Sequence, residues 1–203
     1  MLYRSFIGGQ EVVLECSARF HSAAYALLDA LRSLNDKGPS LHDGSKIKYG
    51  WSILTLRAES GFLRVYEPAF DGNPLKDVSP NLDITLEIFE QQAFVLRSSG
   101  LSGVDVVFSD EVFVRNRALE ASNIFLKRQQ PKRSGDSGWY IGNMDDVDGD
   151  TSGDSLEIVK VFELLRRRPA VLQALALPPD YLVVMRDDKI SEILDQDGRN
   201  YWN

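Results

Sequence analysis

Stretches that alternate like β-strands and stretches with helical spacing interleave along this 203-residue chain, without a regular strand–helix–strand repeat. A doubly wound parallel sheet requires such a repeat, because parallel neighbours are joined by long crossovers that usually carry a helix. The sequence therefore predicts an α+β fold with mixed or antiparallel sheets and packed helices. The length allows one large domain or two small ones, and 43% hydrophobic residues suffice for a core.

The first half of the chain predicts a complete small unit. Residues 2–16 are strand-like around a turn at Gly8-Gly9, and the apolar residues of 24–34 recur at helical spacing. A second helix is expected to start at Ser79-Pro80 and to end at Ser99-Gly100. We therefore predict an N-terminal α+β unit over residues 1–100, whose sequence indicates no family.

A hairpin is predicted between these two helices. Residues 46–56 alternate, which places one set of side chains on a single face: Ile47, Tyr49, Trp51 and Ile53. After a turn at 59–61, residues 62–66 return as the second strand.

The second half, residues 101–203, is expected to form another α+β domain. Strands are predicted at 104–108, 123–127, 139–141, 181–185 and 189–194, whereas 110–121 is ambiguous between strand and helix. Asp154 and Glu157 fit a capping box, which predicts a helix with its apolar stripe from Ile158 to Leu165. A short helix should follow from Pro169 to Leu175.

The net charge of the chain is concentrated in residues 136–157. This stretch contains seven of the 30 acidic residues and no Lys or Arg, so that outside it acids and bases both number 23. Such a local imbalance indicates a partner or a bound ion more than a requirement of folding. A solvated acidic loop is the plain alternative.

Composition narrows the class of protein. A chain with net charge −7 is a poor nonspecific binder of nucleic acid, and its apolar runs are far too short to cross a bilayer. The N-terminus lacks the apolar core of a signal peptide, and Cys16 is the only cysteine, which excludes an intrachain disulfide. We expect a cytoplasmic protein.

Catalytic motifs are weak. Gly135-Asp136-Ser137-Gly138 is similar to the sequence around a chymotrypsin-like nucleophile, but that chemistry needs a base, and neither His21 nor His42 lies in a base motif. Phosphate-binding, dinucleotide-binding and zinc patterns do not occur. The sequence predicts no catalytic residues, no cofactor and no enzyme activity.

Calcium is the alternative use of the acidic stretch. If Asp146 is position 1 of an EF-hand-type loop, ligands fall at every expected position through Glu157 at position 12. Against this, Thr151 stands where the turn needs Gly, and a strand is predicted in place of the entering helix. A calcium-binding regulatory or enzymatic module over residues 146–157 therefore remains open.

The second half resembles a known family. Residues 101–195 contain a series of features in the order found there: Ser109-Asp110, the strand 123–126, Asp136-Ser137-Gly138-Trp139, Gly142, the acidic loop, and a helix ending near Pro169 with Leu172, Leu175 and Pro178. This order resembles the bacterial polymorphic-toxin immunity family called immunity protein thirty-three. The resemblance implies a cytoplasmic, non-enzymatic protein that binds and neutralises a cognate toxin.

Both arguments lead to one hypothesis about the site. The predicted partner-binding residues are Asp145, Asp146, Asp148, Asp150 and Trp139, facing a toxin with a basic contact surface. Trp139 starts an apolar strand, so we expect its ring to be buried as an anchor for the loop; an exposed ring would mark an interface hot spot.

Overall fold

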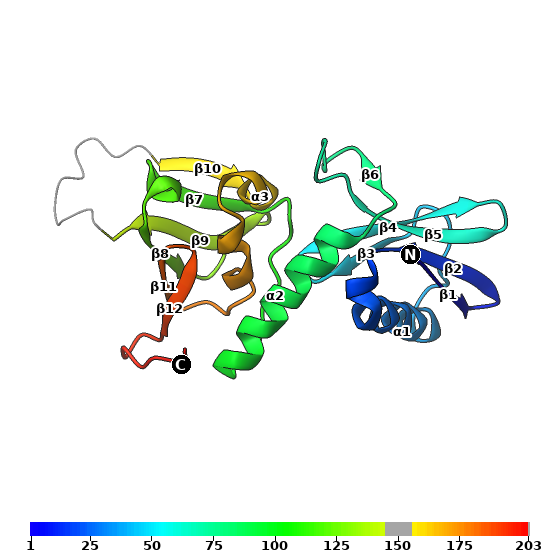
Figure 1. The fold of residues 1–203 in the computed structure, drawn as a ribbon, viewed down its shortest axis with the longest axis horizontal. Coiled ribbons are helices and arrows are strands. Elements are labelled where there is room, and N and C mark those ends of the chain that lie inside the picture. The colour runs from blue at the N-terminus through cyan, green and yellow to red at the C-terminus, as the bar shows by residue number, and fades with distance from the viewer. Residues whose placement is uncertain (145–155, 203) are drawn as a thin grey trace. The chain divides into compact units, whose positions relative to one another are not determined.

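The computed structural model describes residues 1–144 and 156–202, and the chain divides into two compact units, Met1–Glu90 and Gln91–Asn203 (Figure 1). Each unit contains a mixed sheet with helices, which confirms the α+β class. The predicted binding residues Asp145, Asp146, Asp148 and Asp150 lie outside the described residues. No described helix is long and apolar enough to cross a membrane.

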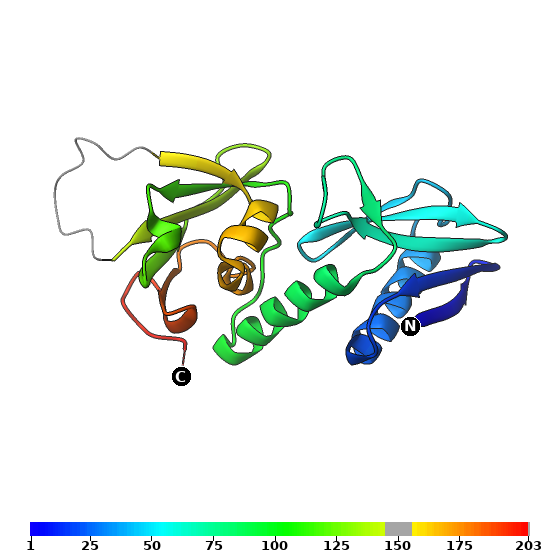
Figure 2. The same ribbon diagram turned by 45° about the horizontal axis from the view of Figure 1, so that its top comes forward.

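The first unit is a sheet with one long helix against it. Its elements are β1 (Leu2–Ile7), β2 (Gln10–Glu15), α1 (His21–Lys37), β3 (Lys46–Tyr49), β4 (Ser52–Glu59), β5 (Phe62–Pro68), β6 (Val78–Ser79) and the start of α2 (Asp83–Ser99). The sheet order is β1-β2-β5-β4-β3, with β6 paired to β5, and only β2 and β5 are parallel. Figure 2 shows α1 along the part of the sheet formed by β1 and β2.

The core of this unit follows the predicted periodicities. In α1 the buried residues Ala24, Leu27, Leu28 and Leu31 keep the i, i+3, i+4, i+7 spacing, and they pack on Val12 and Leu14 of β2 and on Leu54 and Leu56 of β4. The turn at Gly8-Gly9, the helix and the β4–β5 hairpin were all predicted correctly.

The predicted continuous strand over 46–56 is wrong. The chain turns at Gly50 and Trp51, so that β3 and β4 form an additional hairpin closed by Tyr49 and Ser52. Gly50 has φ 55°, and a side chain there would meet the ring of Phe89. Because the turn resets the alternation, Leu54 is buried and Ile53 is not, and the predicted shared face ends at the turn.

The second unit contains a six-stranded sheet. Its elements are the end of α2, β7 (Glu111–Arg115), η2 (Ala118–Glu120), β8 (Asn123–Arg128), β9 (Asp136–Asn143), β10 (Leu156–Lys160), η3 (Val161–Glu163), α3 (Leu164–Arg167), η4 (Pro169–Ala174), β11 (Leu182–Arg186) and β12 (Lys189–Leu194). The order is β10-β7-β9-β8-β11-β12, with β7 and β9 parallel. The short helices α3 and η4 lie against one face of this sheet (Figures 1 and 2).

Two predictions for this unit need correction. Residues 104–108 form no strand, although Val106 and Phe108 are buried. The predicted helix after Asp154 is wrong, because residues 156–160 form β10, antiparallel to β7, and the helical turn begins only at Val161. Pairing along the whole of β10 outweighs the local capping signal, since tertiary contacts commonly override local preference.

The start of α2 also differs from its prediction. Ser79 belongs to β6, and the helix begins at Asp83, whose N–H donates to the side chain of Asn81. The N–H of Thr85 in the first turn donates to the carboxyl of Glu67 at 2.7 Å. Glu67 is almost fully buried, and this burial raises its pKa to about 7 despite the opposing hydrogen bonds from Thr85.

Glu67 should therefore make the stability of the first unit depend on pH. Its folded pKa of about 7 lies above the unfolded value of about 4.3, so the folded state binds the proton more tightly. Its effect on the free energy of unfolding is most favourable below the unfolded pKa and declines as pH rises through the folded pKa. We expect Glu67→Gln to be more stable than wild type at pH 8 by up to about 3 kcal/mol, with little gain at pH 4.5.

Urea unfolding of wild type and Glu67→Gln at pH values from about 4.5 to about 8 measures the difference in the free energy of unfolding. Equal slopes of stability against pH in wild type and variant would contradict the assignment.

Candidate interaction site

The segment that begins β9 is a tightly hydrogen-bonded turn. The carboxylate of Asp136 accepts from the N–H of Lys132 at 3.0 Å and from that of Gly138 at 2.7 Å. The bond from Lys132 is the main reason that the pKa of Asp136 is lowered. Gly138 has φ 76°, and a Cβ there would collide with the carbonyl of Gln129, so this position requires glycine.

Ser137 belongs to the framework of this turn. Its hydroxyl donates to the carbonyl of Glu111 and accepts from the N–H of Trp139, and the residue is 1% exposed. Both histidines of the chain belong to the first unit, so the second unit has no imidazole to act as a base on Ser137. The arrangement is that of a structural turn.

Trp139 is buried, as the sequence predicted. Its side chain is fully buried, and its indole N–H donates to the carbonyl of Leu175 at 2.9 Å. The guanidinium of Arg128 lies 5.7 Å from the centre of its ring. Direct contact between Trp139 and a partner would need this packing to open, and its predicted part in partner binding stays a prediction.

Arg128 is the buried charge beside this anchor. It is 1% exposed, and its guanidinium donates to the carbonyls of Ser137, Val104 and Leu177. Burial lowers the pKa of Arg128 to about 10, which keeps it charged at neutral pH. One side chain thus links the end of β8 to the start of β9 and to two segments without regular structure.

The opposite face of the second sheet exposes aromatic side chains. Val112, Val114, Trp139, Ile141, Ile124 and Leu126 point to the core, whereas their neighbours Phe113, Tyr140 and Phe125 are half-buried. Phe113 pairs with Tyr140, and the rings of Tyr140 and Phe125 are 5.8 Å apart. We call Phe113, Phe125, Tyr140 and Ile158 the open sheet face.

Exposed apolar residues stand at both described ends of the acidic stretch. Met144, which precedes it, is 44% exposed, and Leu156 and Ile158, which follow it on β10, are 55% and 54% exposed. Ile158 pairs with Phe113, so this strand extends the open sheet face. Beside it lies a hollow of about 300 Å³, lined by Phe113, Tyr140, Leu156, Gln129, Lys132 and Arg133 among others.

Charged residues border this face in pairs. Glu111 contacts both Lys160, at 3.1 Å, and Arg133, and the hydrogen bond from Lys160 is the main reason that its pKa is lowered. On the opposite face of the edge strand, Glu157 pairs with Arg167 of α3 at 2.7 Å. These exposed pairs orient side chains and contribute little stability.

The calcium alternative loses two of its supports. The expected exiting helix is the strand β10, and Glu157, the predicted position 12 ligand, is engaged with Arg167. Positions 1 to 9 of that predicted loop lie outside the described residues. Within residues 1–144 and 156–202, no cluster of three or more His, Cys, Asp or Glu could hold a metal ion.

A family comparison covers this same region. The Imm33-like domain family matches residues 91–196, which contain the turn, the anchor and the open sheet face. The chain belongs to the Imm33-like family. This confirms the predicted resemblance to an immunity-protein family, and the match begins where the second unit begins. No curated protein matches the chain, and no solved structure does.

The open sheet face of the Imm33-like domain was not predicted from the sequence. Ile158 was predicted to be buried on a helix, whereas it is exposed on β10, and Phe113 fell in the stretch that was ambiguous. The available signal was the run of three apolar residues Val112, Phe113 and Val114, because such a run places apolar side chains on both faces of a strand. A strand of this type needs cover on both sides.

Arg128 should be far more sensitive to substitution than an exposed arginine of the same domain. Arg128→Met leaves buried carbonyls unpaired, each at a cost of about 1–3 kcal/mol, so we expect a loss of at least about 3 kcal/mol in the free energy of unfolding. Arg133→Met, at an arginine whose side chain is 58% exposed, is the matched control and should change stability by less than about 1 kcal/mol. Urea unfolding followed by tryptophan fluorescence measures both, and equal effects would refute the assigned role.

Proposed function

We propose that this chain is an immunity protein that binds a cognate bacterial toxin and neutralises it by occupying a surface of the toxin, without catalysis. The observation that carries the proposal is an open aromatic sheet face within the domain that the Imm33-like family covers. Aromatic and aliphatic side chains at intermediate exposure are typical of the centre of protein–protein interfaces.

The acidic stretch supplies the second half of the proposed interface. Asp145, Asp146, Asp148 and Asp150 lie in the sequence between Met144 and Leu156, the two exposed apolar residues. A toxin surface that complements both would be basic around an apolar centre, with the charges accelerating association and the apolar contacts slowing dissociation. The proposed setting is the cytoplasm, where a toxin would be met before it acts.

The apolar part of the proposal is tested by Leu156→Glu. We expect the affinity for the toxin encoded beside this gene to fall by about 10-fold or more, mainly through faster dissociation, because a carboxylate would be desolvated in the interface. Leu75→Glu is the matched control, since Leu75 is also 55% exposed but lies in the first unit. Surface plasmon resonance measures both rates, and equal affinities for the two variants would remove β10 from the interface.

The acidic part is tested by reversing Asp146, Asp148 and Asp150 to Lys. We expect association to slow by about 10-fold at low ionic strength, with a smaller effect at high salt. The control reverses Asp36, Asp77 and Glu90, exposed acids of the first unit, and produces the same change in net charge.

If the two triple variants associate at the same rate, only total charge matters and the acidic stretch is not part of the interface. If neither Leu156→Glu nor the acidic variant affects toxin binding, the proposed surface is wrong.

A further inference from the structure

The first unit, which the family match does not cover, contains a cavity of about 660 Å³. It lies between the end of α1, the loop 38–45 and β3, and its apolar walls are Leu34, Leu41 and Ile47. Leu34 is 48% exposed, on a helix whose other stripe residues are buried. The volume is in the range of sites that enclose a ligand or a large side chain.

The loop that forms one wall is fixed by hydrogen bonds at several points. The N–H of Leu41 donates to Asn35 at 3.1 Å, the N–H of Gly44 donates to the carbonyl of Leu56 at 2.8 Å, and Asp43 accepts from the N–H of Ala58 at 2.8 Å. These bonds fix the loop that lines the cavity. A pre-formed site costs less ordering entropy on binding than one that must be assembled.

The strand beside the cavity is an edge of its sheet. β3 pairs with β4 alone among the described strands. Tyr49 and Ser52 close the two-residue turn as a hydrogen-bonded pair, so by the antiparallel alternation the N–H and C=O of Lys46 point away from β4. Another strand could therefore be added along this edge, next to the cavity.

The charge around the cavity is opposite to that of the chain. Its lining contains Lys37, Lys46 and Lys48 and no carboxylate, whereas the protein as a whole has net charge −7. Lysines on an edge strand discourage pairing with neutral or basic strands, since an added strand would remove water from their ammonium groups. Acidic side chains directly opposite them would turn this cost into a favourable cross-strand pair.

We propose that the edge of β3 and the adjacent cavity form a second binding site, for an extended acidic segment of a partner protein. The segment adds to β3 as a strand, its carboxylates face the lysines, and one large apolar side chain enters between Leu34 and Leu41. This site does not depend on the proposed toxin interface, because it lies wholly in the first unit.

A synthetic probe tests the proposal on the full chain. The probe is a fluorescein-labelled peptide in which glutamate alternates with leucine and valine, and two further peptides replace glutamate with lysine or methylate alternate backbone nitrogens. We expect saturable binding of the acidic peptide in fluorescence anisotropy, and binding at least about 10-fold weaker for both control peptides. The methylated peptide keeps the charges but cannot complete the strand.

Variants then locate the bound peptide. Lys46→Glu together with Lys48→Glu should weaken binding by about 10-fold or more, and Leu34→Asp should do the same, while Lys76→Glu, at another exposed lysine of the first unit, should leave it unchanged.

Circular dichroism and thermal unfolding verify that each variant is folded. The proposal is overturned if the acidic peptide shows no saturable binding up to about 1 mM, if the methylated peptide binds equally well, or if Lys76→Glu matches the double variant.

Discussion

The organisation of the Imm33-like domain depends on the burial of Arg128 beside Trp139. A charged group removed from water is costly unless every donor has a partner, and here carbonyls of Ser137, Val104 and Leu177 accept from it. Those carbonyls come from segments far apart in sequence, so the guanidinium can be satisfied only when all of them are in place. The indole N–H of Trp139 adds a further tie to Leu175 from the same side. These hydrogen bonds of Arg128 and Trp139 require β9 to lie close to β8. The tight turn at Asp136–Gly138 brings the two strands together.

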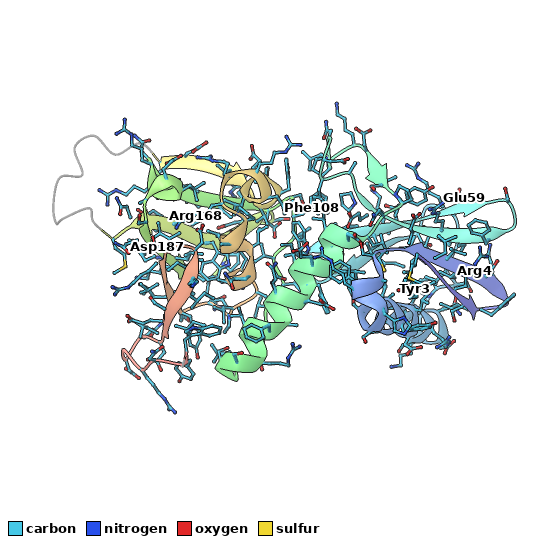
Figure 3. All side chains as sticks on the ribbon, in the orientation of Figure 1. Tyr3, Arg4, Glu59, Phe108, Arg168 and Asp187 are labelled. Atoms are coloured by element: carbon cyan, nitrogen blue, oxygen red, sulfur yellow. The ribbon has the colours of Figure 1, made fainter. Side chains whose placement is uncertain are left out.

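A second buried arginine also donates hydrogen bonds that connect distant segments of this domain. Arg168, labelled in Figure 3, is 7% exposed, donates to Asp188 at 2.7 Å and to the carbonyl of Ala121, and follows directly after α3. Neither α3 nor η4 is long enough to be stable on its own. Hydrogen bonds from buried arginines to carbonyls therefore stabilise these short elements against the sheet, because their own length is insufficient. The helical layer consequently covers one face, and the aromatic residues of the other face have no such cover among the described elements.

The sequence predicted the elements whose signal is local and failed where pairing decided the outcome. Helix α1, the β4–β5 hairpin and the strands β8, β11 and β12 follow from periodicity and turn residues within each segment. The helix predicted after Asp154 is in fact β10, since five residues from Leu156 to Lys160 pair with β7, and no local pattern encodes a partner strand about forty residues earlier. The burial of Arg128 likewise depends on carbonyls of segments far away in the sequence, which no local pattern encodes. For the candidate site, the sequence located the acidic stretch and the buried anchor, but the open sheet face required the register.

The open sheet face exposes apolar side chains to water, and folding alone does not explain this cost in free energy. Ile158 and Leu156 are more than half exposed on an edge strand, where a charged or polar residue would keep the same pairing with β7 and lower the risk of aggregation. Their burial by a partner would recover roughly 25 cal/mol for each Å² of apolar surface removed from water. In the proposed interface, the acidic stretch would oppose self-association, because two copies would bring like charges together. The proposed interface would therefore disfavour a homodimer and favour a basic partner, which is the selectivity that a specific inhibitor of one protein requires.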